Sequence, residues 1–360
     1  MTGLYIHIPF CKRKCPYCDF YSIVENDETI FHRYVKTLLL EADKYKDKRI
    51  EIDTVYLGGG TPSLMDEKLI LTLLNGINER FKVCDNVEIT IEANPSSVDF
   101  SKLSGYRKAG INRISFGIQS SSDRELKALG RLHNFDEAKK AVFYARQAGF
   151  ENISADIMIA LMGQTKSDVK KSVEDIVELG TTHISSYILK VEDNTPYAEM
   201  NLTLPDDDDT AEMYLYMSDM LKGFGYQHYE ISNFSRPGYE SRHNLKYWRA
   251  EEYIGLGVSA HSYFNGSRYY NKRNLTAYLN GESVKVIEEK NINKSEEYLM
   301  LSLRLSEGIS TDKYILLGGN AEILDKAREI GNRFIKINGE RLSLTEEGFL
   351  VSNEIISRLL

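Results

Sequence analysis

The sequence predicts an α/β fold: a partial or complete (β/α) barrel followed by a small C-terminal helical, winged-helix-like domain. Two observations predict the barrel. Strand-like apolar runs alternate with amphipathic helices over the first two-thirds of the chain, and such units form a parallel sheet with helices outside. In residues 110–115, 149–154 and 180–185, a glycine suited to a helix end precedes a strand by two or three residues. The intervals of 39 and 31 residues each leave room for one strand and one crossover helix.

The predicted elements follow in a regular order from the N-terminus. Residues 4–8 form the first strand, and apolar residues then recur at helical spacing over residues 31–45. The second strand, residues 53–57, ends at three glycines, and Asp66 is positioned to cap the helix after it. A third strand is predicted at residues 87–92. With the three segments above, about six strand–helix units fit before residue 190.

Three parts of the chain are predicted from this pattern. Residues 1–195 form the (β/α) barrel core of the chain. Over residues 196–292 the alternation loosens and tyrosines crowd the sequence, which indicates an extension of the barrel. Residues 293–360 are predicted to be the helical, winged-helix-like domain. Short helical segments there surround residues 333–344, a hairpin pattern with an Asn-Gly pair at its turn.

The composition argues against several classes of protein. The net charge is -8 over 360 residues, whereas a nucleic-acid-binding surface needs a clustered basic face. The four consecutive aspartates at 206–209 are predicted to be the solvated start of a helix. No apolar run is long enough to cross a bilayer and no basic-then-apolar leader is found, so the expected location is the cytoplasm. Peripheral membrane association and a homodimer are left open.

Three of the four cysteines, Cys11, Cys15 and Cys18, fall within eight residues. Disulfides are not expected in a large, cysteine-poor chain without a leader, whereas close-set thiols in a reducing compartment bind metal. Three thiolates satisfy three irons of a [4Fe–4S] cluster, and S-adenosylmethionine can chelate the fourth iron through its amino and carboxylate groups. The alternative is a zinc site completed by Cys84 or a histidine. Structural zinc sites prefer two C-x-x-C arms, and only one is present here.

A glycine-rich loop follows the second strand. Gly58, Gly59 and Gly60 precede Thr61 and Pro62, and glycines let the backbone approach a ligand closely and offer unhindered amides. By itself this pattern marks only a turn. After a three-cysteine loop and a strand, it predicts a seat for the amino group of S-adenosylmethionine.

Several short motifs, spread over most of the chain, carry a family resemblance. They are YIHIPFC at 5–11, the cysteine loop at 11–18, GGGTP at 58–62, Glu92 in IEANP, Gln119 in SFGIQ, Arg131 in GRLH, Asp156 in DIMI and GLGVSAH at 255–261. Together they resemble the radical S-adenosylmethionine (radical SAM) superfamily. Within it, the chain is similar to the branch that contains oxygen-independent coproporphyrinogen III oxidase (HemN) and the heme chaperone HemW.

The resemblance implies which residues hold the cofactors. Three cysteines would bind the cluster: Cys11, Cys15 and Cys18. Tyr5 and Tyr17 would flank S-adenosylmethionine. The remaining residues of its site would be Gly59, Gly60, Thr61, Glu92, Gln119, Arg131 and Asp156. Their chemistry is suitable, because carboxylates accept hydrogen bonds from ammonium or ribose groups and arginine pairs with carboxylates. No catalytic residue is assigned.

Two departures from the oxidase pattern resemble HemW instead. The oxidase has a fourth cysteine two residues after the third, where this chain has Phe20, and it has a long N-terminal extension before the motif. Residues 243–248 also match the HNxxYW pattern of HemW. In that pattern His243 is a candidate heme ligand, with Tyr247 and Trp248 packing on the porphyrin. A structural loop with a hydrogen-bonded histidine remains the alternative.

The resemblance therefore implies a heme-binding protein that delivers heme to acceptor hemoproteins and keeps a [4Fe–4S] cluster and S-adenosylmethionine. The alternative function is oxidative decarboxylation of coproporphyrinogen III to protoporphyrinogen IX. A third hypothesis is a radical enzyme that acts on tRNA or another macromolecule, and the acidic composition weighs against it.

Overall fold

Seven parallel strands form the centre of the main sheet in the computed structural model, which describes residues 1–282 and 284–360. They are β1 (Thr2–Ile8), β4 (Glu51–Gly59), β5 (Lys82–Ala93), β6 (Arg113–Gln119), β7 (Asn152–Ile159), β8 (His183–Ile188) and β11 (Tyr253–Leu256). Their spatial order is β11-β1-β4-β5-β6-β7-β8. The six strands predicted before residue 190 are thus confirmed. Further strands extend both edges without pairing to each other in the described ranges, so the barrel is partial.

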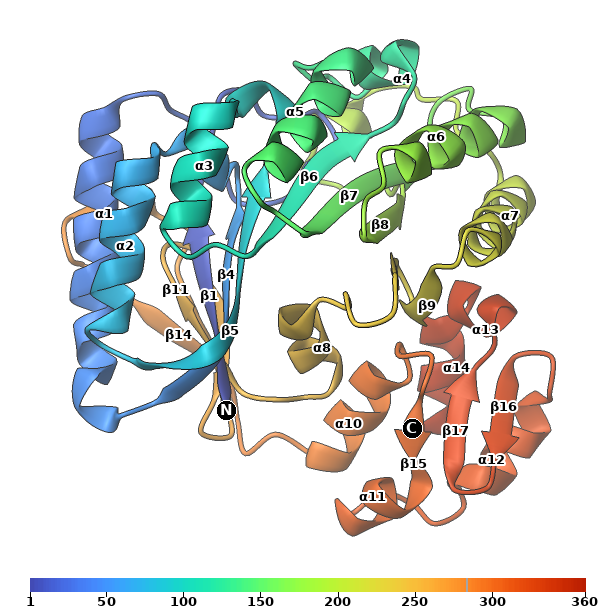
Figure 1. The fold of residues 1–360 in the computed structure, drawn as a ribbon. Coiled ribbons are helices and arrows are strands. Elements are labelled where there is room, and N and C mark those ends of the chain that lie inside the picture. Colours follow the sequence, from blue (N-terminus) through green and yellow to red (C-terminus); the bar gives the residue numbers. More distant parts are fainter. Residues whose placement is uncertain (283) are drawn as a thin grey trace.

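Helices cover the outer side of this curved sheet (Figure 1). They are α1 (Glu28–Ala42), α2 (Glu67–Asn78), α3 (Phe100–Lys108), α4 (Asp123–Ala128), α5 (Phe135–Gln147), α6 (Lys166–Glu178) and α7 (Asp207–Gly223). Leu4, Ile6 and Ile8 of β1 belong to the main hydrophobic core, whereas the alternate residues Tyr5 and His7 line a cavity. Among the helices of the described ranges, none has the length and apolar character needed to cross a membrane.

The predicted helix ends are confirmed. Asp66 caps α2, because its carboxylate accepts a hydrogen bond of 2.6 Å from the Leu69 amide. Asp206 caps α7, so the four aspartates begin a helix as predicted. The three repeat glycines all have the left-handed backbone expected after a helix: Gly110 (φ 103°), Gly149 (φ 90°) and Gly180 (φ 70°).

Nothing in the alternation of the sequence predicts the parallel strand β11. It lies beside β1 with Gly3 opposite Tyr253, so residues far apart in sequence become neighbours in the sheet. The other elements between β8 and the C-terminal part are antiparallel strands or helices. They are β9 (Gln227–Glu230), β10 (Asn233–Ser235), α8 (Arg242–Trp248), β12 (His261–Phe264), β13 (Ser267–Asn271), α9 (Leu275–Leu279) and β14 (Lys285–Lys290). The region thus extends the sheet at both edges.

A small sheet and short helices form the C-terminal part, drawn in orange and red in Figure 1. Its elements are α10 (Lys294–Ser302), β15 (Ile309–Ser310), α11 (Thr311–Leu316), α12 (Ile323–Ile330), β16 (Ile335–Asn338), β17 (Arg341–Leu344), α13 (Glu346–Leu350) and α14 (Ser352–Leu359). The predicted hairpin is confirmed by the antiparallel pairing of β16 and β17. Gly339 at its turn has φ 59°, a conformation that glycine adopts without strain.

Candidate cofactor site and the adjoining cavity

The three-cysteine loop lies between two short strands, β2 (Phe10–Cys11) and β3 (Ile23–Val24). Cys11 is buried, Cys15 and Cys18 are half-buried, and all three thiols are free. A turn joins the last two, since the Cys18 amide donates to the Cys15 carbonyl at 3.1 Å. Burial raises the pKa of Cys11 and of Cys18. Positive charge of the kind that bound iron supplies would favour the thiolate form of these two cysteines.

Two polar groups reach the cysteine sulfurs from other elements. Thr61 Oγ1 lies 3.6 Å from Cys11 Sγ, and Arg131 Nη1 lies 3.7 Å from Cys15 Sγ. Such outer hydrogen bonds orient metal ligands and balance their charge. Within the described ranges, no group of three His, Cys, Asp or Glu side chains converges on a point suited to a single metal ion. Three free thiols within eight residues can each bind a different iron of a cubane cluster, so the residues present fit a cluster.

The glycine loop packs directly on the start of the cysteine loop. The amides of Gly60 and Thr61 donate to the carbonyl oxygens of Ile8 (2.8 Å) and Phe10 (2.7 Å). A Cβ on Gly60 would lie 2.7 Å from the Phe10 oxygen, so only glycine allows this contact. The prediction that the glycine amides are free is therefore wrong for Gly59 and Gly60, because both amides are already bonded within the protein. The ammonium group of S-adenosylmethionine is a hydrogen-bond donor and needs acceptors. In the glycine loop, the backbone carbonyl oxygens are the groups suited to bind it.

Two half-buried carboxyl groups, Glu92 and Asp156, face a cavity of about 380 Å³. Glu92, near the end of β5, accepts hydrogen bonds from the Tyr56 hydroxyl (2.8 Å) and the Gly59 amide (3.1 Å). Burial raises the pKa of Glu92 to about 7. Asp156 on β7 accepts from Ser115 at 3.1 Å, and burial raises its pKa as well. A bound cation would stabilise the ionised form of both groups.

Arg131 and Gln119 also contribute to the polar lining of this cavity. Arg131 Nη2 donates to the Gly117 carbonyl at 2.5 Å, and Nη1 lies 3.4 Å from the Tyr17 hydroxyl. The buried Nε of Arg131 has no partner among the described residues. Gln119 ends β6 with φ 75°. A left-handed backbone at a non-glycine residue costs about 1–3 kcal/mol and is typical of binding sites.

Eight of the nine residues predicted to hold S-adenosylmethionine line this first cavity together. They are Tyr17, Gly59, Gly60, Thr61, Glu92, Gln119, Arg131 and Asp156. Tyr5 is not one of them, because it lines the neighbouring cavity. Ser115, Tyr187 and Lys190 line the first cavity and were missed by the sequence reasoning. Their position in the sequence could have indicated them, because each lies on or just after β6 or β8, and barrel sites form at the ends of such strands.

A second cavity, of about 690 Å³, adjoins the first. Tyr17, Cys18 and Phe20 line both cavities, so the cysteine loop forms a shared wall. Phe20 is 68% exposed, although it is a large apolar side chain. The lining of the second cavity also includes Tyr5, His7, Tyr21, Tyr247, His261 and Arg273.

The HNxxYW segment forms helix α8 beside this second cavity. His243 is fully buried, with Nδ1 2.8 Å from Thr54 Oγ1 and Nε2 2.8 Å from the Tyr247 hydroxyl. Its ring stacks on Tyr56 at 5.2 Å, and burial lowers the pKa of His243 to about 3. Tyr247 lines the cavity, whereas His243 and Trp248 do not. The predicted contact of these three residues with heme stays a prediction.

Comparison with known proteins assigns the family. The radical SAM superfamily profile matches residues 5–176. The heme chaperone HemW of Haemophilus influenzae is 37% identical over 99% of this chain and 97% of its own length. That of Escherichia coli is 36% identical over 99% and 98%, and that of Bacillus subtilis is 33% identical over 100% and 99%. The chain belongs to the HemW family of radical SAM proteins.

A solved structure shows the same fold. The coproporphyrinogen III oxidase HemN from Escherichia coli superposes with a TM-score of 0.86, covering 99% of this chain and 89% of its own. Its sequence identity is 20%. The HemW-family chain therefore has the mixed α/β fold of that radical SAM enzyme, with the small C-terminal sheet and helices described above.

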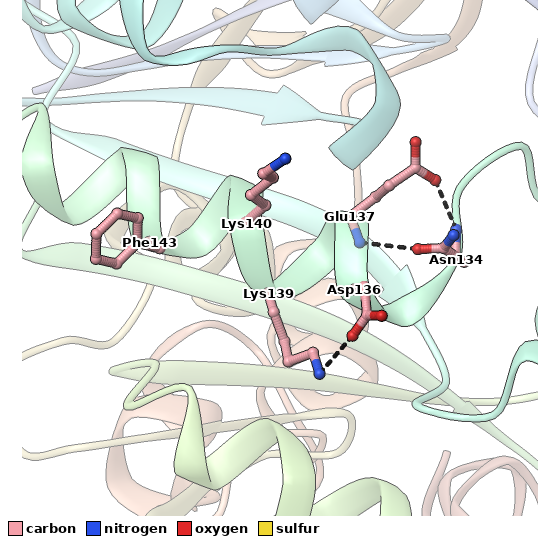
Figure 2. A pocket seen from close by; sticks show the side chains of 6 residues that line it. All are labelled: Asn134, Asp136, Glu137, Lys139, Lys140 and Phe143. Carbon is pink, nitrogen blue, oxygen red and sulfur yellow. Dashed lines mark hydrogen bonds and ion pairs between the residues drawn. The ribbon is translucent and has the colours of Figure 1, made fainter.

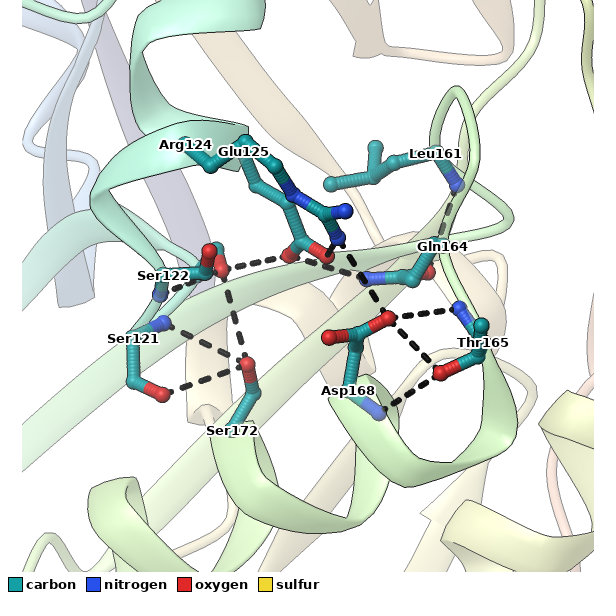
Figure 3. Close-up of polar contacts among 10 residues, drawn as sticks. Ser121, Ser122, Arg124, Glu125, Leu161, Gln164, Thr165, Asp168 and Ser172 are labelled. Carbon is teal, nitrogen blue, oxygen red and sulfur yellow. Dashed lines mark hydrogen bonds and ion pairs between the residues drawn. The ribbon is translucent and has the colours of Figure 1, made fainter.

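A buried polar network supports the strand ends of this HemW-family site (Figure 3). Glu125 of α4 accepts hydrogen bonds from Ser120 (2.6 Å) and from Gln164 (3.1 Å). Gln164 in turn accepts from the Leu161 amide at 3.2 Å. The loop that follows Gln119 is thereby tied to the loop after β7. These hydrogen bonds hold the loop after β6 and the loop after β7 in fixed positions relative to each other.

A hollow on the outer layer of helices is not part of the site. It is lined by Asn134, Asp136, Glu137, Lys139, Lys140 and Phe143, all on α5 or its cap (Figure 2). Asn134 and Glu137 form a capping box, and Asp136 pairs with Lys139. Both contacts stabilise the first turns of the helix.

Proposed function

We propose that this protein is a heme chaperone: it binds heme, delivers it to acceptor hemoproteins, and holds a [4Fe–4S] cluster and S-adenosylmethionine. One observation carries the proposal. Relatives named heme chaperone HemW match the chain over nearly its whole length at 33–37% identity. The site supports the proposal, because a polar cavity and a cavity rich in aromatic side chains share the cysteine loop as their wall.

In this proposal Cys11, Cys15 and Cys18 hold the cluster, and Arg131 and Thr61 balance charge on two of the sulfurs. When bound, the reduced cluster and S-adenosylmethionine supply one-electron chemistry. Glu92 and Asp156 accept hydrogen bonds from ammonium or ribose groups of S-adenosylmethionine. The strained backbone of Gln119 and the short bond from Arg131 to Gly117 keep the lining in one arrangement.

Phe20 favours the chaperone over the oxidase. The oxidase pattern has a fourth cysteine at this position, and an exposed phenylalanine cannot ligate iron. It instead presents an aromatic face where the two cavities meet, which suits contact with a flat apolar ring system.

The test is to incubate the anaerobically reconstituted protein separately with heme and with coproporphyrinogen III. The second reaction includes a reductant and S-adenosylmethionine, and tetrapyrroles are resolved by chromatography. We expect heme to stay with the protein on gel filtration and little or no protoporphyrinogen IX to form. Repeated turnovers to the decarboxylated product, with no heme retained, would replace the chaperone by the oxidase.

A further inference from the structure

We propose that the second cavity is the heme seat, with His261 as the ligand of the heme iron and Arg273 as the partner of a heme carboxylate. This inference rests on the proposed function. It adds His261 and Arg273 to the residues predicted to contact heme, and neither of them lines the first cavity.

The size and the walls of the second cavity fit a porphyrin. Its volume of about 690 Å³ lies within the usual range of about 300–1,000 Å³ for small-molecule sites. Aromatic side chains come to it from four separate segments of the chain: Tyr5, Phe20, Tyr247 and Tyr253. Aromatic rings pack on flat π systems by offset stacking or edge contact, so these walls suit both faces of a macrocycle.

Two imidazoles line the cavity, and among the described residues only that of His261 has a nitrogen without a bonding partner. His7 is buried, with Nδ1 2.9 Å from the Tyr5 hydroxyl and Nε2 2.8 Å from the Tyr21 carbonyl. The side chain of His261 is 50% exposed at the start of β12. No described residue bonds to its Nε2, since its one polar contact is on the other nitrogen. His261 is therefore the imidazole of this cavity that can bind iron without breaking a hydrogen bond.

The contacts of His261 orient its ring in the way typical of metal-binding histidines. Glu288 Oε2 lies 3.5 Å from its Nδ1, and the imidazole stacks on Tyr270 with ring centres 5.0 Å apart and planes 21° apart. A carboxylate on one ring nitrogen favours the proton there and leaves the lone pair on the other. Metal-ligating histidines usually have such an outer partner, which also fixes the plane of the ring.

Arg273 supplies the one cationic side chain among the described residues that line this cavity. Its guanidinium group forms no hydrogen bond or ion pair with any described residue, so it is available to a ligand. Heme has two carboxylate side chains, and arginine binds a carboxylate through two parallel hydrogen bonds. Asp19 and Glu192 also line the cavity and repel a carboxylate. The charges thus direct a heme carboxylate toward Arg273.

The HNxxYW segment then has a supporting role at this seat. Both ring nitrogens of His243 are engaged, and one of them holds the hydroxyl of the cavity residue Tyr247. His243 is a positioning residue for that aromatic wall. Loss of His243 should weaken heme binding without changing the axial ligand, whereas loss of His261 should change the ligand itself.

The experiment titrates ferric heme into the anaerobically reconstituted protein and follows the Soret absorption and the EPR spectrum of the heme iron. His261→Ala, His243→Ala and the control His32→Ala, an exposed imidazole on α1, are compared with the wild-type protein. We expect His261→Ala to lower heme affinity at least tenfold and to lose the imidazole-ligated spectrum. Added imidazole should restore that spectrum. His243→Ala should keep it, and His32→Ala should match the wild type.

Two further measurements make the result decisive. Unchanged circular dichroism and iron content of His261→Ala would show that the variant is folded and loaded. Arg273→Ala should weaken binding of heme severalfold but leave binding of heme dimethyl ester, which lacks the charges, unchanged. Wild-type affinity and spectrum in His261→Ala would overturn the assignment while heme binding itself stands. A wild-type protein that binds no heme would overturn the proposed function as well.

Discussion

Arg131 places one guanidinium nitrogen 3.7 Å from the sulfur of Cys15, and its other terminal nitrogen donates to the Gly117 carbonyl at 2.5 Å. The side chain therefore joins the cysteine loop to the end of β6. Its charge lies beside the sulfur that a cluster would make more negative on reduction. Arg131 thus both positions the cysteine loop and places a positive charge beside it.

Replacing Arg131 with glutamine should weaken retention of the cluster and lower its reduction potential, because a half-buried positive charge beside Cys15 is lost. Loss of an outer hydrogen-bond partner typically weakens a metal site about 10- to 100-fold. Iron release to a chelator and an EPR-monitored redox titration measure the two effects. Arg124→Gln, at a largely exposed arginine on α4, is the matched control. Equal retention and potential in Arg131→Gln and wild type would contradict the prediction.

Three of the four cysteines should be required for the iron–sulfur cluster, and Cys84 should not. Anaerobic reconstitution should yield about four irons and four sulfides per chain, as three-cysteine ligation of a cubane requires. Serine at Cys11, Cys15 or Cys18 should abolish this content. Cys84→Ser should not, because Cys84 lies outside the cysteine loop with its sulfur 3.4 Å from that of Met1. Stoichiometric zinc without labile sulfide, in protein purified without air, would contradict the prediction of a cluster.

Glu92 should make the ligand-free protein less stable as the pH rises. The folded state holds the Glu92 proton up to about pH 7, whereas the usual pKa of a glutamate is 4.5. The folded state therefore binds more protons between these values, and stability should fall there by up to about 1.4 kcal/mol per pH unit. Glu92→Gln should remove this slope and raise the free energy of unfolding at pH 8 relative to wild type.

The same variant should bind S-adenosylmethionine at least tenfold more weakly, because a neutral amide cannot pair with an ammonium group. Denaturant unfolding at pH 5 and pH 8 and equilibrium dialysis give the two readouts. A wild-type pH slope in Glu92→Gln would show that another group is responsible. Wild-type affinity would remove Glu92 from the cofactor site.

Glu346 should stabilise the C-terminal part with the opposite dependence on pH. Hydrogen bonds from His228, Lys222 and Ser218 lower the pKa of Glu346 to about 2. Its contribution is therefore present above about pH 4.5 and is lost as the pH falls toward 2. Glu346→Gln should cost about 1 kcal/mol at pH 7, because the carboxylate is partly exposed and its charge is screened by solvent, and nothing near pH 2. Glu347→Gln, on the exposed pair with Arg333, should have less effect in the same unfolding series.

Gly60→Ala should displace the cysteine loop. The new methyl group would lie 2.7 Å from the Phe10 carbonyl oxygen and 2.9 Å from the Pro9 carbonyl carbon, and backbone atoms cannot move aside cheaply. Overpacking of this kind costs about 1–3 kcal/mol. Gly223→Ala is the matched control, since it meets nothing within 4 Å at the end of α7. Unfolding free energy and iron content should both fall in Gly60→Ala, and equal values in the two variants would refute the contact.

The sequence by itself determined the six strand–helix units of the barrel core, the capped helix ends and the three-cysteine loop. These features are local. A helix end at Gly110 or Gly149 depends on backbone conformations available to glycine, and the cap of α2 depends on Asp66 and residues within one turn of it. Eight residues that line the first cavity could also be named, because the motifs that contain them resemble those of the radical SAM superfamily.

Only the tertiary structure decided which polar groups are already used. The amides of Gly60 and Thr61 are bonded to Ile8 and Phe10, and the nitrogens of His243 are bonded to Thr54 and Tyr247. In contrast, Nε2 of His261 has no partner in the described part of the chain. The parallel strand β11 likewise reaches β1 across some 250 residues. Such pairings depend on long-range packing and on competition among many polar partners. Periodicity and spacing in the chain carry no information about that competition.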